Sequence, residues 1–240
     1  DNVMQANSAW GGNQESSLDD IANAKTWDEF TAIKGGSGMR STCDNSDFCS
    51  AALGQNQNVA IGSNGLTKEE AQKVADYYNS NDVTSSNFID GVIPSKCEKY
   101  NCVSFSYWFV SAFTDASEKG ATSSNLLGNG SYIADTGLPG IGWQNGNDPK
   151  PLSVFGGAGS SAWSHTGVVV GTLEDGDVIT IEAAYGEDEN GNCNGENAQV
   201  LTRPVSYFAQ GVGILAYPDS HFTPEKGYLG NKSLYEIIGK

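Results

Sequence analysis

The chain has 240 residues, and its 29 acidic and 13 basic residues give a formal net charge of -16. This charge argues against a phosphate backbone or an anionic membrane surface as the main partner, so we expect no nucleic-acid binding. No apolar run approaches the roughly 18 to 20 residues that cross a bilayer, so no membrane insertion is expected either.

The composition indicates export. Thirty glycines, five cysteines and few lysines are more typical of an exported protein than of a cytosolic enzyme. The first residues, DNVMQANSAW, lack the basic and apolar regions of a signal peptide, so we expect that any such segment has been removed. We therefore predict a secreted, extracellular or cell-wall-associated protein.

Two helices are predicted within residues 1–85, which we interpret as a helical and irregular N-terminal extension. The first has an apolar stripe over residues 18–30. The second follows Thr67, because Thr67 and Glu70 form a capping-box pattern ahead of apolar residues at helical spacing. A polar linker near residues 80–87 ends this extension.

The five cysteines allow more than one disulfide arrangement. Cys43 and Cys49 lie in a polar segment that is predicted to be irregular, at a separation that can close a small loop. Pairing these two, and Cys97 with Cys193, would leave Cys102 free. A disulfide between Cys102 and either Cys97 or Cys193 stays equally open, because sequence alone does not fix connectivity.

Residues 86–218 are predicted to form one α+β domain. A buried helix begins at Cys102, because the apolar residues after it recur at helical spacing: Phe105, Trp108, Phe109, Ala112 and Phe113. Short apolar runs then predict an antiparallel sheet with strands at residues 152–155, 166–170, 178–183, 199–205 and 213–217. This order indicates a helix packed on one sheet face. Residues 219–240 are predicted to be a C-terminal tail, either a short docked helix or unordered.

The chain has two histidines, His165 and His221, so a mechanism with a histidine base has two candidates. His165 lies in WSHTGVVVG, at the start of a predicted strand, where a strand end can hold an imidazole beside a groove. His221 lies in PDSHFTP, in a predicted loop. A lone histidine is more often structural than catalytic, so the neighbouring residues decide whether a catalytic role is assigned to it.

Cys102 is the candidate nucleophile. The first turn of a helix presents free N–H groups and the positive end of the macrodipole, and both favour a thiolate. The competing interpretation is that Cys102 is half of a disulfide, as described above.

Glu182 is the candidate third group, because it ends the run VITIE in a strand predicted to pair with the histidine strand across LEDGD. A tight two-residue turn would place it opposite Val169, too far from the histidine. We predict a wider loop, which closes on Gly171 and Val178 and places Glu182 opposite Gly167. There it is the diagonal neighbour of the histidine on the same face. If Glu182 is considered alone, a solvent-facing carboxylate on a strand is the better interpretation of this residue.

These residues resemble the CHAP family, the cysteine, histidine-dependent amidohydrolases and peptidases of bacterial and phage cell-wall lysis. The matching features are YNC ending at Cys102, SHTGVVV around His165, IEAAYG around Glu182 and PLSVF at residues 151–155. The order of cysteine, histidine and acid, separated by 63 and 17 residues, is similar to that of the family. The resemblance covers about residues 90–218 and implies a papain-like CHAP/NlpC-P60 fold.

The resemblance implies a secreted cysteine amidase or endopeptidase that cleaves amide bonds in the stem or cross-bridge peptide of peptidoglycan. The Cys102 thiolate would attack the amide carbonyl, His165 would act as base and Glu182 would fix the ring tautomer. The backbone N–H of Cys102 and the Asn101 side chain would stabilise the oxyanion. We expect no cofactor and a monomer.

The chain also departs from the family pattern. Many members carry Gln before the cysteine, where this chain has Asn101, and some carry Asn shortly after the acid, near Tyr185. Tyr185 and the loop residues Trp143 and Trp163 are candidates for substrate binding, although loop tryptophans also fill cores.

Alternatives remain beside this interpretation. In the related NlpC/P60 endopeptidases the third polar group is usually a histidine or a polar residue, so Glu182 favours CHAP. A catalytically inactive secreted CHAP-like interaction module would keep the fold without needing a free, acidic thiol at Cys102. An intracellular thiol enzyme would have all cysteines reduced. No metal site is assigned, because the NGNCNG run at residues 190–195 lacks the twelfth-position Glu of an EF-hand loop.

Overall fold

The computed structural model describes residues 61, 63–158, 165–184, 189–209 and 213–240. The helix predicted over residues 18–30 and the cysteines Cys43 and Cys49 lie outside these ranges. The fold described below therefore concerns the described part of the chain.

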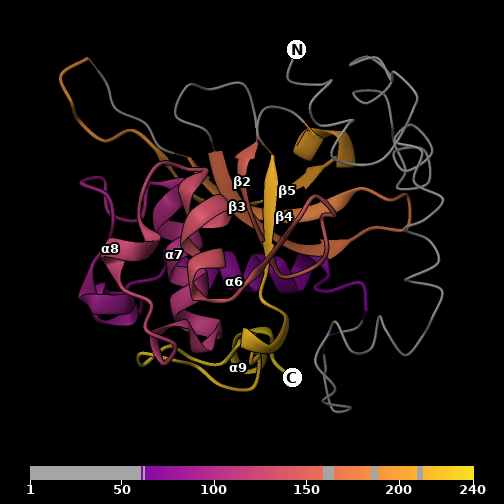
Figure 1. Cartoon of the computed structure of the whole chain (residues 1–240), viewed down its shortest axis with the longest axis horizontal. Coiled ribbons are helices and arrows are strands. Elements are labelled where there is room, and N and C mark those ends of the chain that lie inside the picture. The colour runs from indigo at the N-terminus through magenta and orange to yellow at the C-terminus, as the bar shows by residue number, and fades with distance from the viewer. Residues whose placement is uncertain (1–60, 62, 159–164, 185–188, 210–212) are drawn as a thin grey trace.

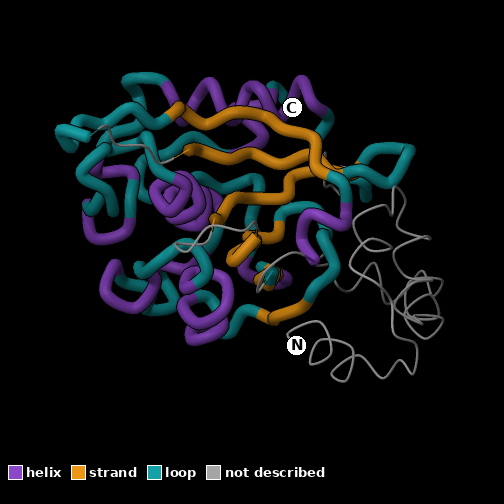
Figure 2. The backbone as a smooth tube through the Cα atoms, turned by 90° about the horizontal axis from the view of Figure 1, so that it is seen from above, coloured by secondary structure: helices purple, strands orange, loops and turns teal. Residues whose placement is uncertain are grey.

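The described residues form an α+β fold around one six-stranded sheet, which confirms the predicted class. Its strand order is β1-β6-β2-β3-β4-β5, and every neighbouring pair is antiparallel. Figure 2 shows the strands side by side with helices around them. The strands are β1 (Gln144–Gly146), β2 (Ser153–Ala158), β3 (His165–Thr172), β4 (Val178–Ala184), β5 (Glu196–Arg203) and β6 (Ile214–Tyr217).

Helix α7 (Cys102–Phe113) is the central helix, and all of its residues are buried because its sequence is apolar on nearly every side. It packs against β3 and β4 and is drawn beside the strands in Figure 1. The other described helices are α6 (Lys68–Asn79), α8 (Ser123–Leu126) and α9 (Leu234–Ile238). Shorter helical turns are η1 (Ser85–Asn87), η2 (Ile89–Gly91), η3 (Asp115–Ser117), η4 (Ile133–Gly137), η5 (Pro139–Ile141), η6 (Val205–Ala209) and η7 (Asp219–His221).

Helix α6 begins as its sequence predicts. Thr67 and Glu70 form a reciprocal capping box, and the predicted apolar stripe is buried: Ala71, Val74, Ala75 and Tyr78. This stripe belongs to the same apolar core as α7 and the sheet, and so does the apolar side of α9. The domain boundaries expected at residues 85 and 218 stay predictions.

Two polar contacts at the end of α6 join it to the rest of the fold. Asn79 Nδ2 donates to Ala198 O at 2.9 Å, and Ala198 N donates to Asn79 Oδ1 at 3.0 Å, so this side chain pairs with the backbone of β5. Lys99 Nζ donates to Tyr78 O at 3.0 Å and to Ser80 O at 2.5 Å. The second contact anchors the segment that leads into α7.

Cys97 and Cys193 form a disulfide, which links the segment before α7 to the loop between β4 and β5. Cys102 carries a free thiol and is buried. Among the described cysteines, the thiol at the start of α7 is therefore the one left for chemistry.

Candidate active site

Cys102 is the first residue of α7 and is 7 % exposed. Asn101 caps the helix, because its Oδ1 accepts from the backbone N–H of Val103 at 2.8 Å and of Ser104 at 3.4 Å. The cap leaves the backbone N–H of Cys102 without a partner inside the helix and sets the thiol at the positive end of the helix dipole. The sequence thus places a cysteine where a negative charge is favoured.

His165 is the first residue of β3, and its side chain is 25 % exposed. Its ring is hydrogen-bonded to the side chain of Cys102 on one side. On the other side, Nε2 lies 2.8 Å from Glu182 Oε2. The predicted cysteine, histidine and glutamate therefore meet as one chain of contacts.

The pairing of β3 with β4 explains how Glu182 reaches the histidine. Near the site the strands pair in the predicted register: Val168 lies opposite Ile181, and Val169 lies opposite Thr180. Continued by one more residue, this register places Glu182 opposite Gly167. A Cβ built on Gly167 would lie 2.8 Å from Glu182 Cγ, so the glycine leaves the room that the glutamate side chain occupies.

The loop end of the same pair differs from the prediction. The strands close at Thr172 and Val178, with Gly171 opposite Ile179, because Val170 is an extra residue in β3. The backbone N–H of Leu66 donates to Val170 O at 2.7 Å, so the segment before α6 contacts the bulge.

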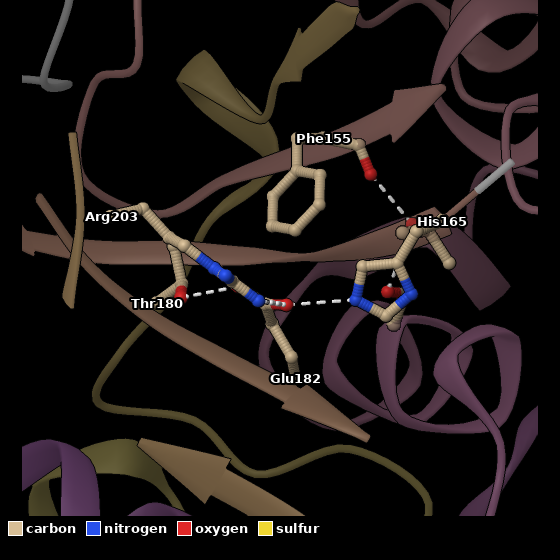
Figure 3. Close-up of polar contacts among 7 residues, drawn as sticks. Phe155, His165, Thr180, Glu182 and Arg203 are labelled. Atoms are coloured by element: carbon tan, nitrogen blue, oxygen red, sulfur yellow. Dashed lines mark hydrogen bonds and ion pairs between the residues drawn. The ribbon is translucent and has the colours of Figure 1, made fainter. Parts of the chain in front are cut away.

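The Glu182 carboxylate is 4 % exposed and accepts hydrogen bonds on both oxygens. Thr180 Oγ1 donates to Oε1 at 2.6 Å, and Arg203 donates to Oε1 through Nε at 3.0 Å and to Oε2 through Nη2 at 2.8 Å. Figure 3 shows the carboxylate between the guanidinium of Arg203 and the ring of His165. Glu182 is thus a buried ion-pair partner, not a solvent-facing carboxylate.

These contacts change the pKa values of the site. Burial disfavours the charged His165 ring, but hydrogen bonds and charge interactions with Cys102 and Glu182 outweigh it and raise its pKa to about 9. Burial favours the neutral form of Glu182, but the hydrogen bonds from His165, Arg203 and Thr180 lower its pKa to about 2. Between these values the pair carries an imidazolium and a carboxylate.

Arg203, Thr180 and Tyr207 were not predicted from the sequence. Thr180 lies two residues before Glu182 in one strand, and that spacing puts the two side chains on the same face. Arg203 is one of two arginines in the chain and ends β5, the neighbour of β4. Tyr207 follows in η6, with Arg203 Cζ 4.4 Å from its ring centroid.

Of the three predicted substrate-binding residues, the structure describes Trp143. Trp143 is 3 % exposed and stacks on His221, with ring centroids 6.1 Å apart, which fits the core-filling alternative. Trp163 and Tyr185 lie outside the described residues. The second histidine, His221, instead has its Nδ1 2.7 Å from Asp115 Oδ1.

A protein-family model matches part of the chain. The model of the CHAP domain matches residues 94–184, a range that contains Cys102, His165 and Glu182, and this confirms the resemblance found in the sequence. Among solved structures, a crystal structure of an N-acetylmuramoyl-L-alanine amidase from Staphylococcus aureus is similar, with 15 % identity and a TM-score of 0.31. That similarity covers 51 % of this chain and 32 % of the amidase chain, about a third of its length. No curated protein matches the chain.

The described ranges contain neither a candidate metal cluster nor a candidate membrane span. No group of three or more His, Cys, Asp or Glu side chains there could hold a metal ion. No helix in the same ranges combines the length and the apolar character needed to cross a membrane.

Proposed function

We propose that the chain is a secreted cysteine hydrolase that cleaves amide bonds in the peptide part of peptidoglycan. The observation that carries this proposal is the contact chain in which a free thiol at a helix start meets His165, and His165 meets Glu182 at 2.8 Å. The CHAP match over residues 94–184 supports the same reaction class.

In this proposal the Cys102 thiolate attacks the carbonyl carbon of the scissile amide. Glu182 occupies Nε2 of His165, so Nδ1 is the ring nitrogen left for the thiol and for the leaving amine. The imidazolium donates its proton to that amine, and a thioester forms on Cys102. His165 then takes a proton from water, which hydrolyses the thioester and regenerates the thiol.

The oxyanion would be stabilised by the backbone N–H of Cys102, a contact type worth on the order of 3 kcal/mol for one donor. The Asn101 side chain is the proposed second donor. Its Oδ1 is engaged in capping α7, so the amide Nδ2 is the group that would contribute. The helix cap and the oxyanion contact thus use different atoms of one side chain.

The substrate class rests on the family resemblance. The bond would be the amide to muramic acid, or an amide within the stem or cross-bridge peptide. The disulfide between Cys97 and Cys193 supports an extracellular or cell-wall location, because disulfides persist in oxidising compartments. We further propose that the chain acts as a monomer, and that residues 86–218 make up the catalytic domain.

The test is digestion of purified peptidoglycan by the intact chain, with released amino groups quantified. Cys102→Ser and His165→Ala are expected to lower the rate at least about 1,000-fold, because nucleophile and base act as a unit. His221→Ala is the matched control, since it also removes a histidine paired with a carboxylate. Hydrolysis by Cys102→Ser at the wild-type rate would overturn the proposal. Peptidoglycan binding without any digestion by the wild type would favour the inactive module.

A further inference from the structure

The Glu182 carboxylate contacts Arg203 as well as the histidine that it orients. The guanidinium donates to both carboxylate oxygens, at 3.0 and 2.8 Å, in the fork geometry that makes arginine–carboxylate pairs strong and directional. The same Oε2 that receives Nη2 of Arg203 faces the His165 ring at 2.8 Å. Arg203 and His165 therefore contact the same carboxylate oxygen, Oε2 of Glu182.

Arg203 is itself fixed on its other side. Its guanidinium carbon lies 4.4 Å from the centroid of the Tyr207 ring, and the ring of Phe155 lies 6.2 Å from that of Tyr207. Tyr207 stays neutral, because burial and the charge of Glu182 raise its pKa to about 12. The guanidinium thus sits between an aromatic face and a carboxylate, with its side chain 30 % exposed.

The contact of Arg203 with Glu182 also affects the charge balance when the thiolate forms. When the thiol transfers its proton to the imidazole, the charges from Cys102 outward are negative, positive, negative and positive, the last on Arg203. Without Arg203, the thiolate would form near an uncompensated buried carboxylate in a chain of net charge -16. With Arg203, it forms near a carboxylate whose charge is already balanced.

We propose that Arg203 is a positioning residue of the active site, which fixes the Glu182 carboxylate and balances its charge so that the thiolate and the imidazolium coexist. The inference rests on the proposed function. Arg203 lies beyond residues 94–184, the range matched by the CHAP domain model. The charged and titratable groups that interact with the pair are Cys102, His165, Glu182, Arg203 and Tyr207.

The test uses the pH dependence of Cys102 alkylation, read by mass spectrometry of its peptide, because this needs no substrate. The positive charge of Arg203 favours the thiolate and disfavours the imidazolium. In Arg203→Gln we therefore expect the alkylation midpoint to move upward by about one pH unit. The histidine titration, followed by NMR, should move in the same direction. Arg203→Lys keeps the charge, so its midpoint should stay near that of the wild type.

Lys226→Gln is the matched control. It also removes a cation that pairs with a glutamate, Glu118 at 2.9 Å, and lies over a tyrosine ring, Tyr228 at 4.1 Å. It does so near the far end of α7, where Thr223 N donates to Phe113 O. This variant should leave both the midpoint and the activity unchanged.

A folded Arg203→Gln variant with an unchanged midpoint would overturn the inference, since a merely structural arginine changes stability alone. If Arg203→Gln does not fold, the kcat of Arg203→Lys tests the inference instead. Its single ammonium cannot hold both oxygens in the same fork, so kcat should fall at least about fivefold with KM unchanged. An unchanged kcat would count against the proposal. If the wild type hydrolyses no peptidoglycan, the proposed function fails, while the alkylation midpoints still decide the role of Arg203.

Discussion

Ser106 and Thr166 share a buried hydrogen bond of 3.1 Å between α7 and β3, the two elements that begin with Cys102 and His165. Ser106 lies one turn after Cys102 on α7, and Thr166 follows His165 in β3. Thr166 Oγ1 also donates to Phe155 O in β2 at 2.6 Å. This pair of hydroxyls therefore fixes the helix that carries the thiol against the strand that carries the imidazole.

Replacing Ser106 by alanine should destabilise the fold by about 1 kcal/mol, because Thr166 loses a buried partner. Ser104→Ala is the control: Ser104 lies in the same helix, is also buried, and its hydroxyl has no hydrogen-bond partner among the described residues. Chemical denaturation of both variants measures the difference. Equal stability losses would show that the Ser106 contact contributes nothing beyond hydroxyl burial.

Gly167→Ala should disturb the site itself. The added Cβ would lie 2.8 Å from Glu182 Cγ and 2.8 Å from two atoms of the Phe155 ring, so the Glu182 side chain or the Phe155 ring must shift. We expect at least a tenfold loss of kcat/KM for peptidoglycan hydrolysis. Gly140→Ala, where nothing lies within 4 Å of the added Cβ, is the control. A fully active Gly167→Ala variant would mean that the position of Glu182 is not critical.

Activity should fall on the alkaline side as the imidazolium loses its proton. The pKa of His165 is raised to about 9, so the form able to protonate the leaving amine persists below that value and disappears above it. A profile of kcat/KM between pH 5 and 10 should therefore show its alkaline limb near pH 9. A limb near 6.5, the ordinary histidine value, would show that Cys102 and Glu182 do not hold the imidazolium.

Stability should depend on Glu182 at acidic pH. Its pKa is lowered from 4.5 to about 2, so its contribution is complete above 4.5 and is lost as pH falls through about 2. The shift corresponds to roughly 3 kcal/mol. In Glu182→Gln the free energy of unfolding should change less between pH 5 and 2 than in the wild type. Parallel curves for the two proteins would exclude this carboxylate as a source of acid sensitivity.

Lys99→Met should loosen the segment before Cys102. The ammonium binds two backbone carbonyls at the end of α6, and hydrogen bonds of a charged group contribute about 1.5 to 3 kcal/mol. We expect a lower Tm and faster amide exchange in the segment that precedes α7. Lys119→Met, which removes a lysine 3.9 Å from Asp115, is the control. Identical exchange in the two variants would contradict the anchoring role.

The sequence predicted the part of the site that local patterns determine. A helix start at Cys102, a strand start at His165 and a strand pairing that runs to Glu182 follow from apolar spacing and from counting along two strands. The loop closure was wrong by one residue because of the bulge at Val170. Leu66 and Asn64, distant in sequence, bind the backbone at Val170 and Thr172, and no pattern near the loop reveals this contact.

Arg203 and Trp143 show what sequence patterns did not provide. The role of Arg203 depends on the packing of a third strand beside the site, and a lone arginine at a strand end carries no pattern of its own. Trp143 lies in a polar, glycine-rich segment that suggests a surface loop, yet it fills the core beside His221. The positions of Arg203 and Trp143 both depend on contacts with residues that are distant in the sequence.

The pairing of Asn79 with Ala198 bears on how the molecule behaves at high concentration. Strand β5 is the last strand of the sheet, and its outer backbone groups would otherwise offer a template to a strand of another chain. The amide side chain at the end of α6 already engages both the N–H and the carbonyl of Ala198. The Asn79 side chain therefore disfavours edge-to-edge aggregation at β5, the strand that carries Arg203.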